Sequence, residues 1–301
     1  MEEFYSNGKL LLTGEYAILD GAKGLAVPSR YGQFLTVKKS NTGQINWRSL
    51  SDTNTPWFTA DLALPNLEIL DTSDTSLANR LVQIFEAISN LNSSFINDHQ
   101  GSYIDTKLTF PRHWGLGSSS TLINNMANWA QVNPYDLLSA TFGGSGYDIA
   151  CAQNKSPITY SNKEDSPIIE KVDFNPSFKN QIFFVHLNKK QNSRDAINAY
   201  RKLIIDKEVL IREINHLTLQ MTQCDELWEF ERIMAAHENL ISKTLDIPTV
   251  KQQLFYDFPG GIKSLGAWGG DFIMATGTLE EMRYFSQKGF TTILSYTQMI
   301  L

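Results

Sequence analysis

Residues 111–120 form the feature that most constrains this chain, a Gly- and Ser-rich loop that leads directly into a helix-like segment. The loop reads Pro-Arg-His-Trp-Gly-Leu-Gly-Ser-Ser-Ser, and the helical pattern covers residues 121–132. Glycine lets the main chain approach an anion closely, and the unpaired N–H groups and dipole of a helix start favour negative charge. The segment therefore predicts a phosphate-binding cradle. A simpler alternative is a Gly-Ser turn in which Ser118 or Ser119 caps the helix.

The loop follows neither of the two common phosphate-binding patterns. No Lys follows the glycines, as G-x-x-x-x-G-K-[ST] requires, and Ser120 stands where G-x-G-x-x-G needs its third glycine. A phosphate here would therefore be held by main-chain N–H groups and hydroxyl side chains.

The composition excludes several classes of function. The formal net charge of −6 gives no electrostatic attraction to nucleic acid or to an anionic membrane. No run approaches the roughly 18 apolar residues of a membrane span, and the first residues lack a signal-peptide pattern. We therefore expect a cytoplasmic protein, monomeric or homodimeric, with no nucleic-acid or membrane partner. Cys151 and Cys224 are far apart in the sequence and are expected to be reduced thiols.

The 301 residues suggest two domains, with a boundary near residues 162–180. Short strand-like runs at residues 9–12, 25–27 and 34–37, separated by glycine-containing turns, open the chain. Residues 40–76 fit exposed hairpins or a flap. Apolar residues at helical spacing predict an amphipathic helix from Asn79. The same patterns predict the later elements: a buried strand at 181–187, a helix capped by Ser193 and running through Tyr200, two helices packed as a hairpin between 210 and 241, and an apolar strand at 272–275.

A second glycine cluster occupies residues 142–150, Phe-Gly-Gly-Ser-Gly-Tyr-Asp-Ile-Ala. Closely spaced glycines followed by an acid can hold the Asp148 carboxylate on a tight turn that faces a cleft, as a general base or metal ligand requires. The alternative is that Asp148 only caps a helix that begins at Ile149. Ser145 is not a hydrolase nucleophile of the G-x-S-x-G type, because that pattern needs glycine at the position of Tyr147.

A third glycine cluster, residues 259–271, leads into the last apolar strand. Its Gly-Ala-x-Gly-Gly segment is either a plain turn or bulge, or a loop that packs against phosphates. Lys189 and Lys190 lie in a loop before a predicted helix, where they either meet an anionic substrate or are simply solvated. The three glycine clusters are distributed over both halves of the chain, and this favours a nucleotide and substrate cleft between two domains.

The order and form of the clusters resemble the GHMP kinases, a family that includes galactokinase, homoserine kinase, mevalonate kinase and phosphomevalonate kinase. The first family motif matches residues 8–16, although Asn7 stands where Pro is usual, and the second matches residues 111–120 closely. The third matches residues 266–270, with Trp268 in place of a glycine. The string Gly-Tyr-Asp-Ile-Ala at 146–150 is similar to the bacterial GYDIA-family GHMP kinases.

The resemblance implies an α+β, two-domain GHMP kinase fold with an ATP cleft between the domains. A ribosomal-protein-S5-like α/β domain would cover residues 1–165, and a ferredoxin-like α+β domain would cover residues 175–301. ATP and Mg²⁺ are the implied cofactors, and a small-molecule phosphoryl acceptor is the implied partner.

The resemblance also implies site residues. Asp148 would orient or deprotonate the acceptor, Lys9 would neutralise charge on the transferring group, and Ser119 would bind Mg²⁺. The triphosphate would be held by Gly115, Leu116, Gly117, Ser118, Ser119 and Ser120. The acceptor would lie near Glu15, Ser145, Gly146, Lys189, Lys190, Gly266 and Ala267.

The acceptor itself is left open. The Gly-Glu-Tyr that ends the first motif is more typical of phosphomevalonate kinases than of mevalonate kinases, and both acceptors are candidates. Mevalonate kinases supply a Glu to the metal, whereas this chain offers Asp136, one place out of register. A phosphorylated acceptor would need local cations, for which Lys189, Lys190, Arg194, Lys263 and Arg112 are available. The alternative to an enzyme is a nucleotide-binding regulatory protein on the same fold, with a serine hydrolase as a distant third.

Overall fold

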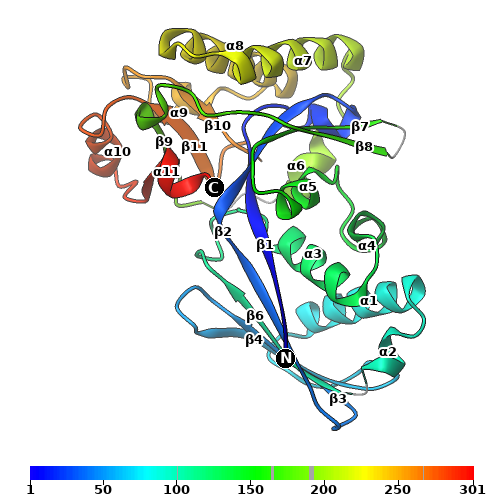
Figure 1. Ribbon diagram of the computed structural model, residues 1–301. Helices are drawn as coiled ribbons and strands as arrows, with labels where there is room; N and C mark the ends of the chain where they lie inside the picture. Colours follow the sequence, from blue (N-terminus) through cyan, green and yellow to red (C-terminus); the bar gives the residue numbers. More distant parts are fainter. Residues whose placement is uncertain (100, 164–165, 190–192, 267) are drawn as a thin grey trace. The chain divides into compact units, whose positions relative to one another are not determined.

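The computed structural model describes the chain except for residues 100, 164–165, 190–192 and 267. The chain divides into two compact units, each built from separate stretches of sequence (Figure 1). The first unit comprises Met1–Gly8, Tyr31–Arg112 and Leu116–Gln153, and the second comprises Lys9–Arg30, His113–Gly115 and Asn154–Leu301. Among the described residues, no helix has the length and apolar character needed to cross a membrane.

The first unit contains a sheet with the strand order β5-β4-β3-β6-β2, and β1 also pairs with β2. β3 and β6 run parallel, whereas the other registered pairs in this part of the sheet are antiparallel. β1 and β2 continue into the second unit. The strands are β1 (Glu2–Leu11), β2 (Gly24–Lys39), β3 (Gln44–Leu50), β4 (Pro56–Ala63), β5 (Glu68–Thr72) and β6 (Ser102–Leu108).

Helices α1, α3 and α4 lie along one face of this sheet (Figure 1). α1 begins where the Asp74 carboxylate accepts a hydrogen bond from Leu77 N, and its apolar stripe includes Leu81, Phe85 and Ile88. The helix predicted from Asn79 is thus confirmed. The helices of the unit are α1 (Thr75–Leu91), α2 (Phe95–Asp98), α3 (Ser118–Ala130), α4 (Pro134–Thr141) and α5 (Tyr147–Gln153).

Two expectations about this region were wrong in part. Residues 40–76 do form hairpins, but Trp47 and Phe58 are buried in the core, so these strands are not an exposed flap. The runs at 25–27 and 34–37 are not separate strands, because β2 continues through both over 16 residues. Gly32 lies within β2, where a Cβ atom would come 2.2 Å from Ser6 O. It is therefore a site of close backbone approach rather than a turn.

The second unit contains a four-stranded antiparallel sheet with the order β10-β11-β9-β12. From β12 across the sheet to β10, the strands are the fourth, first, third and second of these four in chain order. This is the expected ferredoxin-like arrangement. The buried strands predicted near 181–187 and 272–275 are confirmed as β9 (Ile182–His186) and β11 (Phe272–Thr276). The other strands are β7 (Ile158–Lys163) and β8 (Ser166–Lys171), a hairpin beside β2, with β10 (Ile262–Ser264) and β12 (Ile293–Ser295).

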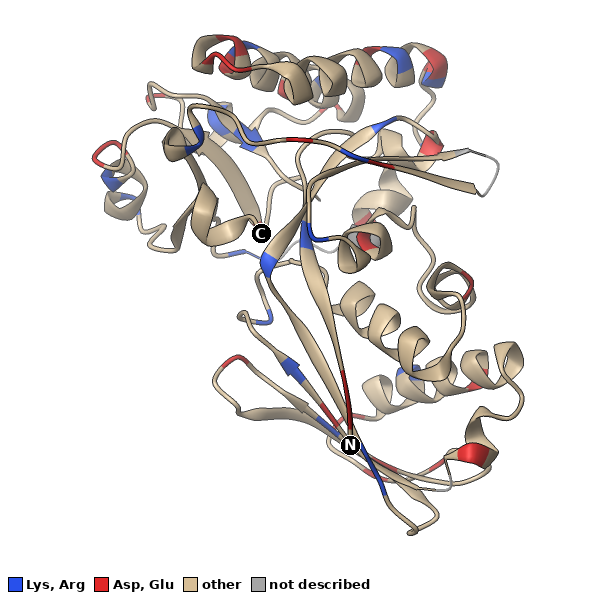
Figure 2. Ribbon diagram, viewed as in Figure 1, with Lys and Arg blue, Asp and Glu red and all other residues tan. Residues whose placement is uncertain are grey.

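Two long helices of this unit, α7 and α8, pack against each other, and α8 also contacts β10. Apolar spacing predicted this pair, and Leu210, Ile214, Phe230 and Met234 are indeed buried. Acidic and basic residues are interspersed along both helices (Figure 2). The helices of the unit are α6 (Ser193–Tyr200), α7 (Lys207–Gln223), α8 (Leu227–Leu245), α9 (Val250–Leu254), α10 (Arg283–Gln287) and α11 (Tyr296–Met299).

Candidate functional site

The Gly-Ser loop places a left-handed glycine at the start of α3. Gly117 is the N-cap residue before the helix, with φ +88°, and it has no side chain with which to cap the helix. Ser118 and Ser119 are the first helical residues, so the alternative in which one of them caps the helix is wrong. The main-chain N–H groups of a first helical turn have no partner within the helix. With the Ser119 side chain exposed beside them, they suit an anion.

Buried polar contacts fix α3 to the sheet of the first unit. Thr121 Oγ1 donates to Gln33 Oε1 at 2.7 Å, and Asn125 Nδ2 donates to Gln33 O at 2.9 Å. The Ser6 hydroxyl of β1 donates to Asn125 Oδ1 at 2.7 Å. Because each group is buried and paired, the contacts specify one position for the start of α3.

The second glycine cluster forms the tight turn that the sequence predicted. Gly143, Gly144 and Gly146 all have positive φ, and α5 follows immediately. Asp148 is the second residue of α5, so the interpretation that it only precedes and caps a helix is wrong. α5 packs on α3 within the first unit, and the Asp148 and Ser145 side chains are partly exposed there. The roles of Asp148, Ser145 and Gly146 toward an acceptor stay predictions.

The third glycine cluster lies in the second unit beside the predicted basic loop. Gly266 and Gly269 have positive φ, and so does Asp271, at +55°. Asp271 N donates to Lys189 O at 2.7 Å, and Leu187 N donates to Asp271 O at 2.8 Å. The Lys189 side chain is exposed. Lys190 and Ala267 lie outside the described residues, and their predicted contacts stay predictions.

The start of the Gly-Ser loop meets the end of the third cluster. A Cβ atom on Gly115, where φ is +68°, would lie 2.3 Å from Asp271 Cγ and 2.5 Å from Asp271 Oδ2. Trp114 also packs edge-on against Phe272, with ring centroids 5.5 Å apart. Gly115 is therefore required by a close approach as well as by its backbone conformation.

The first motif leads into a buried ionic cluster that the sequence did not predict. The Lys263 ammonium donates to Glu15 Oε1, and it lies 3.9 Å from Glu238 Oε1. His237 Nε2 lies 3.3 Å from Glu15 Oε2 and accepts a hydrogen bond from Gly14 N at 3.0 Å. Lys263 is fully buried here, so it is not available as a cation for an acceptor. Glu15, expected near the acceptor, is equally buried; any contact it makes with an acceptor stays a prediction.

Burial controls the protonation of this cluster. Burial raises the pKa of Glu15, and the positive charge of Lys263 opposes this rise. Burial also lowers the pKa of His237 well below its usual value. A neutral His237 whose Nε2 accepts from Gly14 N carries its proton on Nδ1. Burial also raises the pKa of Glu238 to about 7, against the opposing effects of Lys263 and of its hydrogen bonds from Ser264.

Trp268, where the family has a glycine, connects the first and third motifs. Its indole is buried in an apolar cluster with Tyr16, Tyr200 and Leu210. Trp268 N donates to Tyr16 Oη at 3.3 Å, and Tyr16 has a positive φ of +61°. The Trp side chain therefore packs the turn of the first motif against the third glycine cluster. Lys9, the predicted catalytic cation, lies earlier in the same motif and is partly exposed.

The raised pKa of Glu238 leads us to expect that the stability of the protein depends on pH. Because its pKa is raised from 4.5 to about 7, the folded protein retains a proton that the unfolded chain releases. The free energy of unfolding should therefore fall as the pH rises through that window, by on the order of 1 to 3 kcal/mol. Urea unfolding at about pH 5 and about pH 7.5 should show a smaller fall for Glu238→Gln. The exposed Glu280→Gln control should behave like the wild type, and equal slopes for all three proteins would contradict the prediction.

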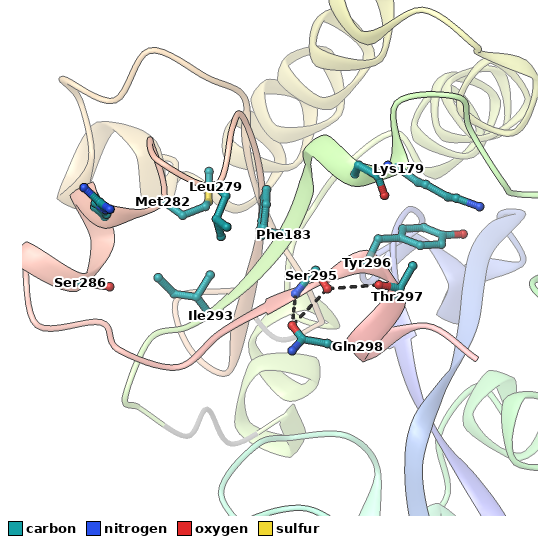
Figure 3. A pocket seen from close by; sticks show the side chains of 12 residues that line it. Lys179, Phe183, Leu279, Met282, Ser286, Ile293, Ser295, Tyr296, Thr297 and Gln298 are labelled. Carbon is teal, nitrogen blue, oxygen red and sulfur yellow. Dashed lines mark hydrogen bonds between the residues drawn. The ribbon is translucent and has the colours of Figure 1, made fainter.

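A surface cavity of ≈ 780 Å³ lies in the second unit (Figure 3), and none of its described lining residues belongs to a glycine cluster. Phe183, Met282 and Ile293 contribute apolar side chains, and Ser295 and Gln298 hydrogen-bond to each other at its side. Among the described lining residues, none belongs to the predicted nucleotide or acceptor site. The cavity therefore adds nothing to the site that the motifs define.

No protein-family model matches the chain, and no curated protein matches it in sequence. Solved structures match along nearly its whole length. The Methanococcus jannaschii mevalonate kinase is 18% identical with a TM-score of 0.70, over 97% of this chain and 96% of that one. The Streptococcus pneumoniae phosphomevalonate kinase, in complex with phosphomevalonate and AMPPNP, is 14% identical with a TM-score of 0.71, over 98% of this chain and 100% of that one.

A sugar kinase matches as well as the mevalonate-pathway enzymes. The Lactococcus lactis galactokinase, complexed with galactose, is 13% identical with a TM-score of 0.71, over 100% of this chain and 93% of that one. Identities this low establish the fold and leave the chemistry to be argued from the site. The three glycine clusters, the ferredoxin-like sheet and these structures agree. The chain therefore has the two-domain α+β fold of the GHMP kinases.

Proposed function

We propose that the protein is an ATP-dependent kinase that transfers the γ-phosphoryl group to a small metabolite. The observation that carries the proposal is the start of α3, where a left-handed Gly117 occupies the N-cap position, so the cap residue itself brings no side chain to the first helical turn. Such a turn offers main-chain N–H groups and a favourable dipole to a triphosphate. The likeness of the whole fold to small-molecule kinases, one of them with AMPPNP bound, supports the same reading.

The residues of the loop suit ATP with Mg²⁺. In kinases, Mg²⁺ is typically held by a few protein oxygens together with phosphate oxygens and water. The exposed Ser119 hydroxyl, in the first turn of α3, is such an oxygen. The main chain of residues 115–120 would hold the phosphates, and the ion would neutralise charge on them.

Two side chains would act on the reaction itself. Asp148 would orient the acceptor hydroxyl or phosphate and accept its proton. Its position in the first turn of α5, directly after a glycine-rich turn, supports this role. Lys9 would stabilise charge on the phosphoryl group in flight. Phosphoryl transfer depends chiefly on such positioning and electrostatic stabilisation, so neither residue needs to form a covalent intermediate.

The acceptor is best sought among small hydroxylated or phosphorylated metabolites. Phosphomevalonate and mevalonate come first because of the Gly-Glu-Tyr of the first motif, and kinases of both acceptors are among the similar structures. The decisive experiment offers the purified protein MgATP with phosphomevalonate, mevalonate, homoserine and simple sugars, galactose included, and measures ADP and phosphorylated product. Transfer to one acceptor establishes the kinase. ATP binding without transfer to any of them favours the nucleotide-binding regulator instead.

Gly117→Asn should weaken ATP binding at least tenfold without unfolding the protein. Asn tolerates the left-handed backbone of Gly117 better than most residues, but its side chain adds bulk where the main chain must approach a phosphate. Titration with ATP and Mg²⁺ gives the affinity, and thermal unfolding reports the fold. Gly43→Asn is the matched control, since Gly43 has φ +69° in the same unit and open space around it. Wild-type ATP affinity in folded Gly117→Asn would refute this use of the loop.

A further inference from the structure

The entrance of the Gly-Ser loop, residues 113–115, is held against one end of the four-stranded sheet. This loop entrance and the strands β9 and β11 all belong to the second unit. Trp114 packs edge-on against Phe272, the first residue of β11, and a Cβ atom on Gly115 would lie 2.3 Å from Asp271 Cγ. The loop entrance therefore takes its position from the ends of these strands.

One buried side chain adds a polar contact to this packing. His186 ends β9, lies opposite Phe272 in the sheet and is 1% exposed. Its Nε2 lies 3.3 Å from His113 O, and its Nδ1 accepts a hydrogen bond from Asn188 N at 3.1 Å. Each ring nitrogen of His186 thus pairs with one main-chain group.

The two contacts fix the place of the proton on the imidazole of His186. A main-chain N–H can only donate, so Nδ1 carries no proton, and the neutral ring carries its proton on Nε2 and donates to His113 O. Burial lowers the pKa of His186 and favours this neutral ring, although the hydrogen bond with His113 O opposes the shift. A buried ring that is bonded at both nitrogens has one orientation, and it holds the His113 carbonyl two residues before Gly115.

We propose that His186 is a positioning residue for the nucleotide, which holds the loop entrance in place through the N–H at its Nε2. The inference rests on the proposed function, because that function assigns the main chain of Gly115 to the triphosphate. His186 contacts neither the nucleotide nor the acceptor in this role. The donor is the essential part, since an apolar side chain at the end of β9 would fill the space without this hydrogen bond to His113 O.

Two substitutions separate the ring nitrogens of His186. The Gln amide reaches about as far as Nε2, so His186→Gln can still donate to His113 O. The shorter Asn amide lies near the place of Nδ1, so His186→Asn can still accept from Asn188 N but loses the donor to His113 O. We expect His186→Asn to weaken MgATP binding about tenfold and His186→Gln to stay within about twofold of the wild type.

Calorimetric titration with ATP in excess Mg²⁺ gives the affinities, and thermal unfolding reports the fold of each variant. The matched controls are His216→Asn and His216→Gln, the same changes at an exposed histidine of α7 in the same unit. Both controls should bind MgATP like the wild type. A purely structural role of His186 would affect its two variants alike, because both replace a buried ring by a smaller amide.

The comparison of the two His186 variants decides the inference. Equal affinities for MgATP, or a weaker affinity in His186→Gln than in His186→Asn, overturn it and leave the proposed function intact. Absence of MgATP binding by the wild type overturns the proposed function, and this inference with it. Should His186→Asn fail to fold, His186→Leu takes its place, because Leu also lacks a donor for His113 O, and the same tenfold loss relative to His186→Gln is expected.

Discussion

Asp148→Asn will lower kcat for phosphoryl transfer by roughly two or more orders of magnitude and leave the affinity for MgATP nearly unchanged. The substitution keeps the shape of the side chain at the start of α5 and removes its charge and basicity. Because the carboxylate is proposed to act on the acceptor, its replacement should not alter the affinity for MgATP. Steady-state kinetics with the acceptor found in the panel, together with an ATP titration, measure both quantities.

The control for this experiment is Asp71→Asn, the same change at an exposed position of β5 in the same unit. It should leave kcat and ATP affinity at their wild-type values. Near-normal turnover in Asp148→Asn would remove the proposed catalytic role. Equal losses of kcat and of ATP affinity would instead assign Asp148 to the nucleotide, and the acceptor-activating group would have to be sought elsewhere.

Lys263→Met will reduce the free energy of unfolding by about 3–5 kcal/mol. Lys263 is fully buried and is the cation that faces Glu15 and Glu238, so removing it leaves buried carboxylates without their compensating charge. Urea unfolding near neutral pH measures the loss. Glu15→Gln with Lys263→Met should recover part of it, because removing both charges of a buried pair is far less costly than removing one.

The solvent-exposed pair of Lys288 and Asp257 provides the comparison for Lys263. Its two groups lie 3.3 Å apart at the surface, and Lys288→Met should have little effect on stability. If Lys263→Met were no more destabilising than Lys288→Met, the buried cluster would not hold the first motif to β10. If the double variant were as unstable as Lys263→Met alone, the loss would come from packing around the Lys stem rather than from unpaired charge.

Local patterns predicted the elements of this fold well. Helices α1, α7 and α8 follow from apolar spacing, and β9 and β11 follow from short buried runs, because each pattern is complete within a few turns or residues. The continuity of β2 was missed, since glycine inside a strand resembles a turn when the approaching strand is unknown. Gly32 is explained by Ser6 O and the Tyr5 ring, which both belong to β1.

The site shows the same division between local and distant information. The positive φ of Gly117 and of the glycines before Asp148 could be expected from composition alone. The ion pair of Lys263 with Glu15 could not, because 248 positions separate the partners and Lys263 sits in an ordinary strand pattern. The close approach of Asp271 to Gly115 could not be predicted either, because no local pattern around Asp271 indicates a contact with Gly115.

The strand β2 has a consequence for how this protein can be divided or recombined. Its residues up to Arg30 belong to one compact unit and those from Tyr31 onward belong to the other. Neither unit is thus encoded by one uninterrupted stretch of gene. A breakpoint within β2, or a fragment cloned from either half, would remove a strand from a sheet that needs it. Exchange of parts with relatives should succeed only when all three segments of a unit are transferred together.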